Sequence, residues 1–435
     1  MKKLLLFAEI CFVVFGLTFF TGGLTPGAST DGVDTGLVPE IIVTAIRYFI
    51  WFVSALLLLL NGKRTLITMR RDWVLWILTV IVLFSFAWSD FPEWTLLANR
   101  EMAQMTCFGL YIATRFSLRE QVKIYALTFA IGAIASVLFA IGLPSVGLDV
   151  DHVGAWRGIY GHKNVFGSMM VMTFLAFFAL PVERPRDRWI KRIGIGLAAA
   201  LILLSTSRTA LVLAVVLLAL MLFYRNYRWR GKRSIVLGSL GVLIGGAATV
   251  LILTNWVAIL TAMGRDPTLT GRTYIWKVSL DYLLDRPLFG FGRSAFWSPD
   301  SPYPRAISSY LSQAFRAPHA HNGFIEIALD VGFVGLILFL ICYVSGFIKA
   351  LMRAYGSKHP EHLWSLGFLT FLALNNMTES YMLRLANIYW VLFIATLLTV
   401  KQRVPIFDDE AELPSLTRSY RELPQAPVGN VREQI

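Results

Sequence analysis

Cysteine is scarce in this chain, and none of it is placed for a disulfide or a metal. The 435 residues hold three cysteines, Cys11, Cys107 and Cys342, and each lies inside an apolar run. A disulfide framework needs an even set of cysteines, and a zinc site needs ligands at short spacings. The sequence predicts neither. It also shows no recognisable nucleotide-binding motif, so we expect no cofactor.

Charged residues are scarce too. They make up 15% of the chain, against 56% hydrophobic residues, and the mean hydropathy is +0.62. A soluble domain does not need so much apolar sequence for its core, so we predict an all-α polytopic membrane protein. The formal charge of +13 comes from basic residues in short clusters between apolar runs. Such clusters orient a membrane protein and contact anionic lipid, which favours membrane lipids over nucleic acid as partners.

Apolar runs of about twenty residues recur along the chain, as membrane-spanning helices require. They predict about twelve transmembrane helices in one membrane domain, residues 1–400, followed by a charged tail at 401–435 that we expect to be disordered in the cytoplasm. Because Lys and Arg concentrate in cytoplasmic loops, both termini are expected inside and one large loop, about 254–321, outside. The expected spans lie near residues 4–20, 41–60, 73–88, 95–114, 122–143, 165–181, 234–253, 323–347, 364–377 and 381–400, with two more around Arg208.

The apolar stretch around Arg208 allows two topologies. It is interrupted by Ser205-Thr-Ser-Arg208-Thr209 and flanked by two five-fold basic clusters. One tilted helix would put these clusters on opposite sides of the membrane, whereas two short helices with Arg208 at an outer hairpin obey the charge rule. We therefore predict the hairpin. A charge at membrane depth is costly and often functional, although a hairpin arginine can also simply reach the interface.

The outer loop contains the motif Gly271-Arg272-Thr-Tyr-Ile-Trp276. Apolar positions at helical spacing predict a short interfacial helix over residues 273–284, stopped by Asp285-Arg-Pro287. Arg272 at its start is suited to phosphate, because a guanidinium binds phosphate oxygens bidentately and helix amides favour an anion. The alternative is a solvated loop arginine. Gly290 and Gly292 follow, and they provide bends and permit mobility.

Pro318-His319-Ala-His321-Asn322-Gly323 stands at the entrance to the tenth expected helix. A histidine with a pKa near neutrality can take a proton from a sugar hydroxyl in a transition state. The alternative is a structural histidine at the interface. His319 and His321 also suggest a metal, but two ligands do not make a site and no acidic cluster lies nearby in the sequence. No metal site is predicted.

A fourth motif is Arg157-Gly-Ile-Tyr-Gly161-His-Lys163-Asn-Val-Phe-Gly167. Its basic residues would bind pyrophosphate or glycan, or would only cap a helix at the membrane surface. For Arg47, and for Arg100 beside Glu101, we favour internal ion pairs or side chains that reach the interface. The predicted topology puts the four motifs on the outer face. Chemistry confined to that face has no ATP, so its substrate must arrive activated, for example as a sugar on a lipid pyrophosphate.

These motifs, in this order, resemble the superfamily of O-antigen ligases and polymerases, including exopolysaccharide polymerases of the ExoQ type. The similarity covers about residues 40 to 400. It is most specific in Ser-x-Ser-Arg208, in Gly-Arg272-x-x-x-Trp, and in His321-Asn followed by Glu326 and Gly332-Phe-Val-Gly335.

The resemblance implies a metal-independent inverting glycosyltransferase with the C-type membrane fold, in the bacterial inner membrane with its active site facing the periplasm. The donor would be an undecaprenyl-pyrophosphate-linked glycan. His321 would activate the acceptor hydroxyl, and Arg208 and Arg272 would hold the pyrophosphate. Arg157, Lys163 and His319 are further candidates for substrate contact.

The acceptor distinguishes three activities within this resemblance. A polymerase uses another lipid-linked repeat unit, a ligase uses lipid A core, and a third class modifies proteins. The compact loop fits a polymerase or a ligase, and the ExoQ-type similarity favours the polymerase, for which a chain-length regulator is a candidate partner. A flippase or transporter of the same lipid-linked sugars is less favoured, because the helix centres are apolar and matched broken helices are not recognisable.

Overall fold

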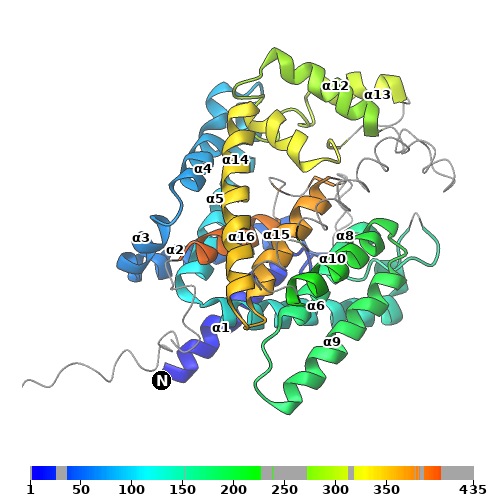
Figure 1. Cartoon of the computed structure of the whole chain (residues 1–435). Helices are drawn as coiled ribbons and strands as arrows, with labels where there is room; N and C mark the ends of the chain where they lie inside the picture. The colour runs from blue at the N-terminus through cyan, green and yellow to red at the C-terminus, as the bar shows by residue number, and fades with distance from the viewer. Residues whose placement is uncertain are drawn as a thin grey trace, which may run out of the picture.

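The computed structural model describes residues 2–25, 37–150, 152–226, 238, 272–311, 318–377, 379, 380, 382 and 387–402. Its named elements are helices joined mostly by short connections (Figure 1). They are α1 (Lys2–Phe20), α2 (Glu40–Leu60), α3 (Gly62–Met69), α4 (Trp73–Phe84), η1 (Ser85–Trp88), α5 (Pro92–Arg115), α6 (Leu118–Gly142), α7 (Pro144–Gly147), α8 (Lys163–Ala179), α9 (Pro185–Leu204), α10 (Arg208–Asn226), α12 (Arg272–Asp285), α13 (Tyr303–Leu311), α14 (Gly323–Gly356), α15 (His362–Asn376) and α16 (Ile388–Val400).

Several of these helices are long and apolar enough to cross a bilayer. Within the described residues five qualify singly: Lys3–Phe20, Glu40–Leu60, Leu118–Gly142, Arg208–Arg225 and Gly323–Gly356. A sixth span results if α3 and the segment Trp73–Trp88, bent by 95°, cross as a pair. α8 and α16 are apolar but shorter. The chain is therefore a multi-pass membrane protein.

Each expected span that falls within the described residues contains a helix, and in the last one, 381–400, the helix α16 begins at Ile388. The interfacial helix expected at 273–284 is also confirmed, as α12. The count of about twelve spans stays a prediction, because the segment 234–253 lies outside the described residues except for residue 238. Much of the expected outer loop, at 254–271 and 312–317, and the tail from residue 403 also lie outside them.

The chain turns sharply at the Ser-Thr-Ser-Arg motif. α9 ends at Leu204 and α10 begins at Arg208, with Thr206 between them at φ +50°. A non-glycine residue with positive φ marks a tight reversal that a continuous helix cannot contain. Two helices rather than one tilted helix therefore flank Arg208, as predicted.

α5 is long enough to span a bilayer but carries several charges, and these pair with neighbouring helices. Glu101 forms an ion pair with Arg47 of α2. Arg115 forms one with Glu9 of α1, at 2.6 Å. Pairing lowers the cost of a charge inside a membrane bundle. The internal ion pair expected for Arg47 is thus confirmed.

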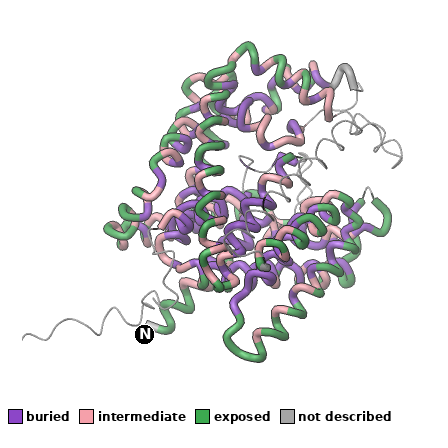
Figure 2. Tube along the Cα trace, in the orientation of Figure 1, coloured by how far each residue is buried: buried purple, intermediate pink, exposed green. Residues whose placement is uncertain are grey.

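The centre of the bundle is formed by α5, α8, α15 and α16 (Figure 2). α16 is buried along its whole length, whereas Ile41 and Leu59 on the outside of α2 are each 78% exposed, an apolar surface suited to lipid. A Cβ atom at Gly109 of α5 would lie 2.7 Å from the Val391 carbonyl oxygen of α16. Glycine is therefore required for this close helix contact, a common role for small residues between membrane helices.

Candidate active site

A polar segment after α15 connects several of the residues singled out by the sequence. The chain leaves α15 with the Glu379 amide donating to the Asn375 carbonyl oxygen at 3.0 Å. Ser380 follows, and its Oγ accepts the Asn322 amide at 3.0 Å. A Cβ atom at Gly323 would lie 2.1 Å from Oδ1 of Asn376. The end of α15 is therefore packed directly against the beginning of α14.

His321 stands at that beginning, in a constrained turn. The Asn322 side chain caps α14, because its Oδ1 accepts the amides of Phe324 at 3.0 Å and Ile325 at 3.3 Å. The His321 amide donates to Nδ1 of His319 at 3.1 Å, and the two rings lie 4.0 Å apart. His321 has φ +52°. Such left-handed conformations cost energy in non-glycine residues and concentrate at functional sites.

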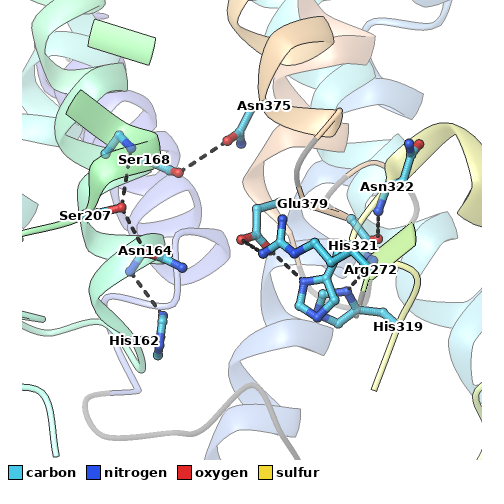
Figure 3. A network of polar contacts seen from close by, with 12 residues as sticks. His162, Asn164, Ser168, Ser207, Arg272, His319, His321, Asn322, Asn375 and Glu379 are labelled. Carbon is cyan, nitrogen blue, oxygen red and sulfur yellow. Dashed lines mark hydrogen bonds and ion pairs between the residues drawn. The ribbon is translucent and has the colours of Figure 1, made fainter. Parts of the chain in front are cut away.

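Glu379 lies between His321 and Arg272. One carboxylate oxygen is 3.4 Å from Nδ1 of His321, and the other is 3.5 Å from Nη2 of Arg272. The Glu379 side chain is 10% exposed, and those of His321 and Arg272 are 22% and 25% exposed. An ionised carboxylate only accepts hydrogen bonds, so Nδ1 carries the proton in this contact and Nε2 is the basic nitrogen. We call Arg272, His319, His321 and Glu379 the histidine–glutamate cluster (Figure 3).

The histidine turn is held by side chains from three elements. Trp276, one turn into α12, donates from Nε1 to the Ala320 carbonyl oxygen at 2.8 Å. Glu326 of α14 accepts the Ala320 amide at 2.9 Å and Nε1 of Trp297 at 2.7 Å. These bonds fix both ends of Ala320, the residue between the two histidines. They explain why Trp276 and Glu326 accompany Arg272 and His321 in the sequence motifs.

A second polar group lies across from the first (Figure 3). Nδ1 of His162 accepts the Asn164 amide at 3.1 Å and so caps α8. Asn164 Oδ1 accepts the Ser207 hydroxyl at 2.9 Å, which joins α8 to the turn before α10. Ser168 contacts Asn375 at 3.5 Å. We call His162, Asn164, Ser168 and Ser207 the asparagine–serine cluster.

The six residues proposed for the site from the sequence fall into three places. Arg272, His319 and His321 lie together in the histidine–glutamate cluster. Arg208 is exposed at the first position of α10, directly after Ser207, and Lys163 is the first residue of α8, next to His162. The Arg157 guanidinium donates to three backbone carbonyl oxygens. Nε donates to Val146 at 2.8 Å, Nη1 to Gly161 at 3.4 Å and Nη2 to Ser145 at 3.3 Å.

Comparison with known proteins supports the assignment suggested by the motifs. A family model described as O-antigen ligase matches residues 193–340. The exopolysaccharide production protein ExoQ of Rhizobium meliloti (strain 1021) is 28% identical over 311 residues, which cover 68% of this chain and 71% of that protein. These similarities support a relationship to the O-antigen ligase superfamily, over the matched part of the chain.

The segment that matches the family model does not include every residue of the candidate site. A protein of Rickettsia conorii (strain ATCC VR-613 / Malish 7), provisionally named a polysaccharide ligase, is 29% identical over 93 residues, 20% of this chain and 21% of that protein. The matched segment 193–340 contains Arg208, Arg272 and the two histidines of the cluster. Glu379 and His162 lie outside it. The structure thus adds residues to the site that the superfamily segment does not contain.

Glu379 is the residue that sequence reasoning missed. No acidic cluster lies near the two histidines in the sequence, but folding brings Glu379 beside His321 from 58 positions away. A signal was present in Asn375-Asn376-Met-Thr-Glu379-Ser380, a polar run at the end of an apolar segment. A glutamate at the end of an apolar segment in a membrane protein is a candidate for the site.

Two groups of side chains among the described residues have the composition of a metal site. They are His319, His321 and Glu379, and Asp149, His152 and His162, with ligand atoms within 4.8 Å of one another in each group. In both groups one histidine Nδ1 already accepts a backbone amide, from His321 in the first and Asn164 in the second. While Nδ1 accepts this bond, the neutral ring carries its proton on Nε2, so either nitrogen could bind a metal only if the hydrogen bond broke. The residues therefore fit a metal poorly in their present arrangement.

Asp149 anchors the loop that leads into α8. Its carboxylate accepts Nδ1 of His152 at 3.0 Å and the Lys163 amide at 3.0 Å. Burial opposes ionisation of this carboxyl, but the hydrogen bonds from His152 and Lys163 outweigh burial and hold the Asp149 pKa below its usual value. The start of α8, and with it His162, is positioned by this carboxylate.

Proposed function

We propose that this protein is a glycosyltransferase that polymerises lipid-linked repeat units into a polysaccharide. The observation that carries the proposal is the contact of one carboxylate, Glu379, with both His321 and Arg272. This arrangement joins a base to a phosphate-binding cation. Transfer of a glycan from a lipid pyrophosphate to a hydroxyl needs both, because a proton must be removed while negative charge develops on the leaving group.

In the proposed reaction, Nε2 of His321 takes the proton of the acceptor hydroxyl. The hydroxyl oxygen then forms a bond to the anomeric carbon of the donor as the bond from that carbon to the pyrophosphate oxygen breaks, with inversion. Glu379 stabilises the imidazolium that results, since it accepts from Nδ1. The pyrophosphate leaves with the electron pair of the broken bond.

Arginines offset the charge of the leaving group in this proposal. Arg272 stands at the first position of α12, where helix amides also favour an anion. Arg208 is exposed on the side of the asparagine–serine cluster, and Lys163 and His319 are additional contacts. With fixed cations in this role the reaction is proposed to be metal-independent. Arg157, whose donors are engaged by backbone carbonyls, has a scaffold role.

The proposed setting follows from charge and from the relatives. The positive-inside rule puts both termini in the cytoplasm and the site at the periplasmic face of the bacterial inner membrane. The donor is then an undecaprenyl-pyrophosphate-linked glycan and the acceptor a lipid-linked repeat unit, in keeping with the similarity to an exopolysaccharide production protein. A ligase that uses lipid A core is the second candidate, because the matching family model is described as O-antigen ligase.

One experiment separates the two candidates. Surface and lipid-linked polysaccharides are extracted from cells that lack this gene and compared on a gel. Single repeat units in place of long polymer support the polymerase, whereas full-length polymer retained on undecaprenyl pyrophosphate supports the ligase. The wild-type gene should restore the profile and Arg272→Ala should not. If Arg272→Ala, expressed at the wild-type level, restored polymer length and amount, the proposed function would be wrong.

A further inference from the structure

α14 is not one continuous helix. Its backbone leaves helical geometry at Val331 (φ −136°, ψ 17°) and Gly332 (φ 70°, ψ −174°). The break separates a two-turn first segment, residues 323–330, from the long remainder. His321 and Asn322 immediately precede the first segment, so its direction sets the position of the histidine turn.

A break releases backbone groups that need new partners inside a membrane protein. The turn after α12, residues 287–294, supplies them through four backbone hydrogen bonds. The pairs are Phe291 N to Leu329 O (2.8 Å), Gly292 N to Asp330 O (3.1 Å), Phe333 N to Pro287 O (2.7 Å) and Val334 N to Leu288 O (3.2 Å). The turn thereby provides hydrogen-bond partners on both sides of the break.

Two glycines permit this fit. A Cβ atom at Gly290 would lie 2.4 Å from the Leu329 carbonyl oxygen, and one at Gly332 would lie 2.1 Å from the Leu288 carbonyl oxygen. Both residues have positive φ, +65° and +70°. The bend expected at Gly290 is therefore confirmed, and its glycine is required by close backbone contact.

A fully buried arginine lies at the centre of this junction. Arg293 is 0% exposed, its amide donates to Ser85 Oγ at 3.1 Å, and its Nη1 donates to the Ala98 carbonyl oxygen. Burial lowers the pKa of its guanidinium, and the charges of Asp330 and Glu101 oppose this shift. Asp330, at the end of the first segment of α14, also accepts the Ser294 amide at 2.8 Å.

The electrostatics of the first segment of α14 favour a cation at this end. The carboxyl end of a helix carries partial negative charge, and Asp330 adds to it when its carboxyl group is ionised. An unpaired buried carboxylate is strongly unfavourable, so removal of the arginine would push Asp330 away from the junction or leave it destabilised. The turn 287–294 and the first segment of α14 are therefore held together by charge as well as by backbone bonds.

We propose that Arg293 is a positioning residue for the active site. By balancing Asp330 it fixes the first segment of α14, and so aligns His321 at the opposite end of that segment with Arg272 at the start of α12. A test of this role by enzymatic activity assumes the proposed function, whereas a test by hydrogen–deuterium exchange does not.

The test uses the full-length protein in detergent and three variants. Arg293→Met removes the buried charge at similar length, and Arg293→Lys retains it. Arg286→Met is the matched control, because Arg286 lies in the same connection but forms a surface ion pair with Asp90 at 2.7 Å and is 40% exposed. Two readouts are taken, namely hydrogen–deuterium exchange of peptides covering 287–294 and 319–330, and kcat and KM for elongation of a lipid-linked oligosaccharide.

Arg293→Met should speed exchange in both peptides at least about tenfold and lower kcat at least about tenfold, as expected for a buried carboxylate left without its partner. KM should change little, Arg286→Met should match wild type, and Arg293→Lys should recover part of both readouts. The double variant Arg293→Met/Asp330→Asn removes both charges and should also recover part of the exchange protection and of kcat. If Arg293→Met does not fold, the comparison uses this double variant and Arg293→Lys.

Equal exchange in Arg293→Met and Arg286→Met would overturn the proposal. So would a double variant that exchanges as fast as Arg293→Met, because charge balance would then not be the cause. If wild-type protein elongates no lipid-linked oligosaccharide, the proposed function fails, while the exchange comparison still decides the role of Arg293.

Discussion

The two polar clusters that face each other in Figure 3 are assembled in different ways. In the asparagine–serine cluster, His162 caps α8 two residues before Asn164, and Ser205 and Ser207 bond within one turn. In the histidine–glutamate cluster, the contacts of Glu379 reach across 58 and 107 residues, to His321 and Arg272. The asparagine–serine cluster is neutral apart from its histidine, and it combines these local bonds with contacts over 43 and 207 residues, from Ser207 to Asn164 and from Ser168 to Asn375. The histidine–glutamate cluster is charged.

This difference separates two tasks. Proton transfer and charge compensation need ionisable groups at fixed distances, which the packing of α12, α14 and α15 provides. Neutral donors and acceptors suit sugar hydroxyls, and the helix cap at His162 helps to position them. We therefore expect substitutions in the histidine–glutamate cluster to affect the rate of transfer and those in the asparagine–serine cluster to affect binding.

The largest effect is expected for His321. His321→Ala should lower kcat by about two to four powers of ten, the usual contribution of a general base. The measurement is elongation of a lipid-linked oligosaccharide by purified protein. His359→Ala is the control, since that histidine is exposed and its contact with the acidic neighbour Glu361 is long, at 3.9 Å. A rate for His321→Ala within a factor of ten of wild type would remove the base from the mechanism.

The second-largest effect is expected for Glu379. Glu379→Gln keeps the size of the side chain but loses the charge that stabilises the imidazolium and orients Arg272, so we expect kcat to fall by about ten- to a hundredfold. The double variant with Arg272→Met should lose less than the two single variants together, because both residues share one contact. Additive losses in this cycle would show that the two side chains act separately.

A smaller effect is expected in the asparagine–serine cluster. Ser207→Ala removes one neutral hydrogen bond to Asn164, worth about 1 kcal/mol, and should raise KM by roughly fivefold with kcat little changed. Thr206→Gly, in the same turn at φ +50°, should leave both constants near wild type, because glycine adopts that conformation without strain. A fall in kcat with unchanged KM would assign this cluster to the chemical step instead.

The smallest effect concerns the loop before α8. Its stabilisation by ionised Asp149 is fully present above the ordinary aspartate pKa of about 3.9 and is lost as the pH falls through the lower pKa of the folded state. Asp149→Asn should therefore lower the thermal midpoint by a few degrees at pH 7, for a loss of about 1 kcal/mol. The difference between the two proteins should shrink on acidification below about pH 4, and a constant difference would contradict the assignment.

Much of the helical architecture could be predicted from local sequence. Apolar runs gave the helices near residues 4–20, 41–60 and 122–143, and helical spacing gave α12 almost to its ends. The turn before Arg208 followed from charge distribution. The break in α14 could not be predicted, because Val331 and Gly332 begin a long apolar run that is typical of a continuous helix, and the partners that make the break stable come from residues 287–294.

Hydrophobicity and charge along the chain by themselves determined that this is a helical membrane protein with basic and histidine motifs suited to a phosphate-linked sugar. These are properties of contiguous residues, so local sequence is sufficient for them. Only the tertiary structure decided that Glu379 joins His321 to Arg272 and that Arg293 is fully buried where the turn 287–294 meets α14. Those contacts depend on how helices far apart in sequence pack against one another, and the packing is set by the whole bundle.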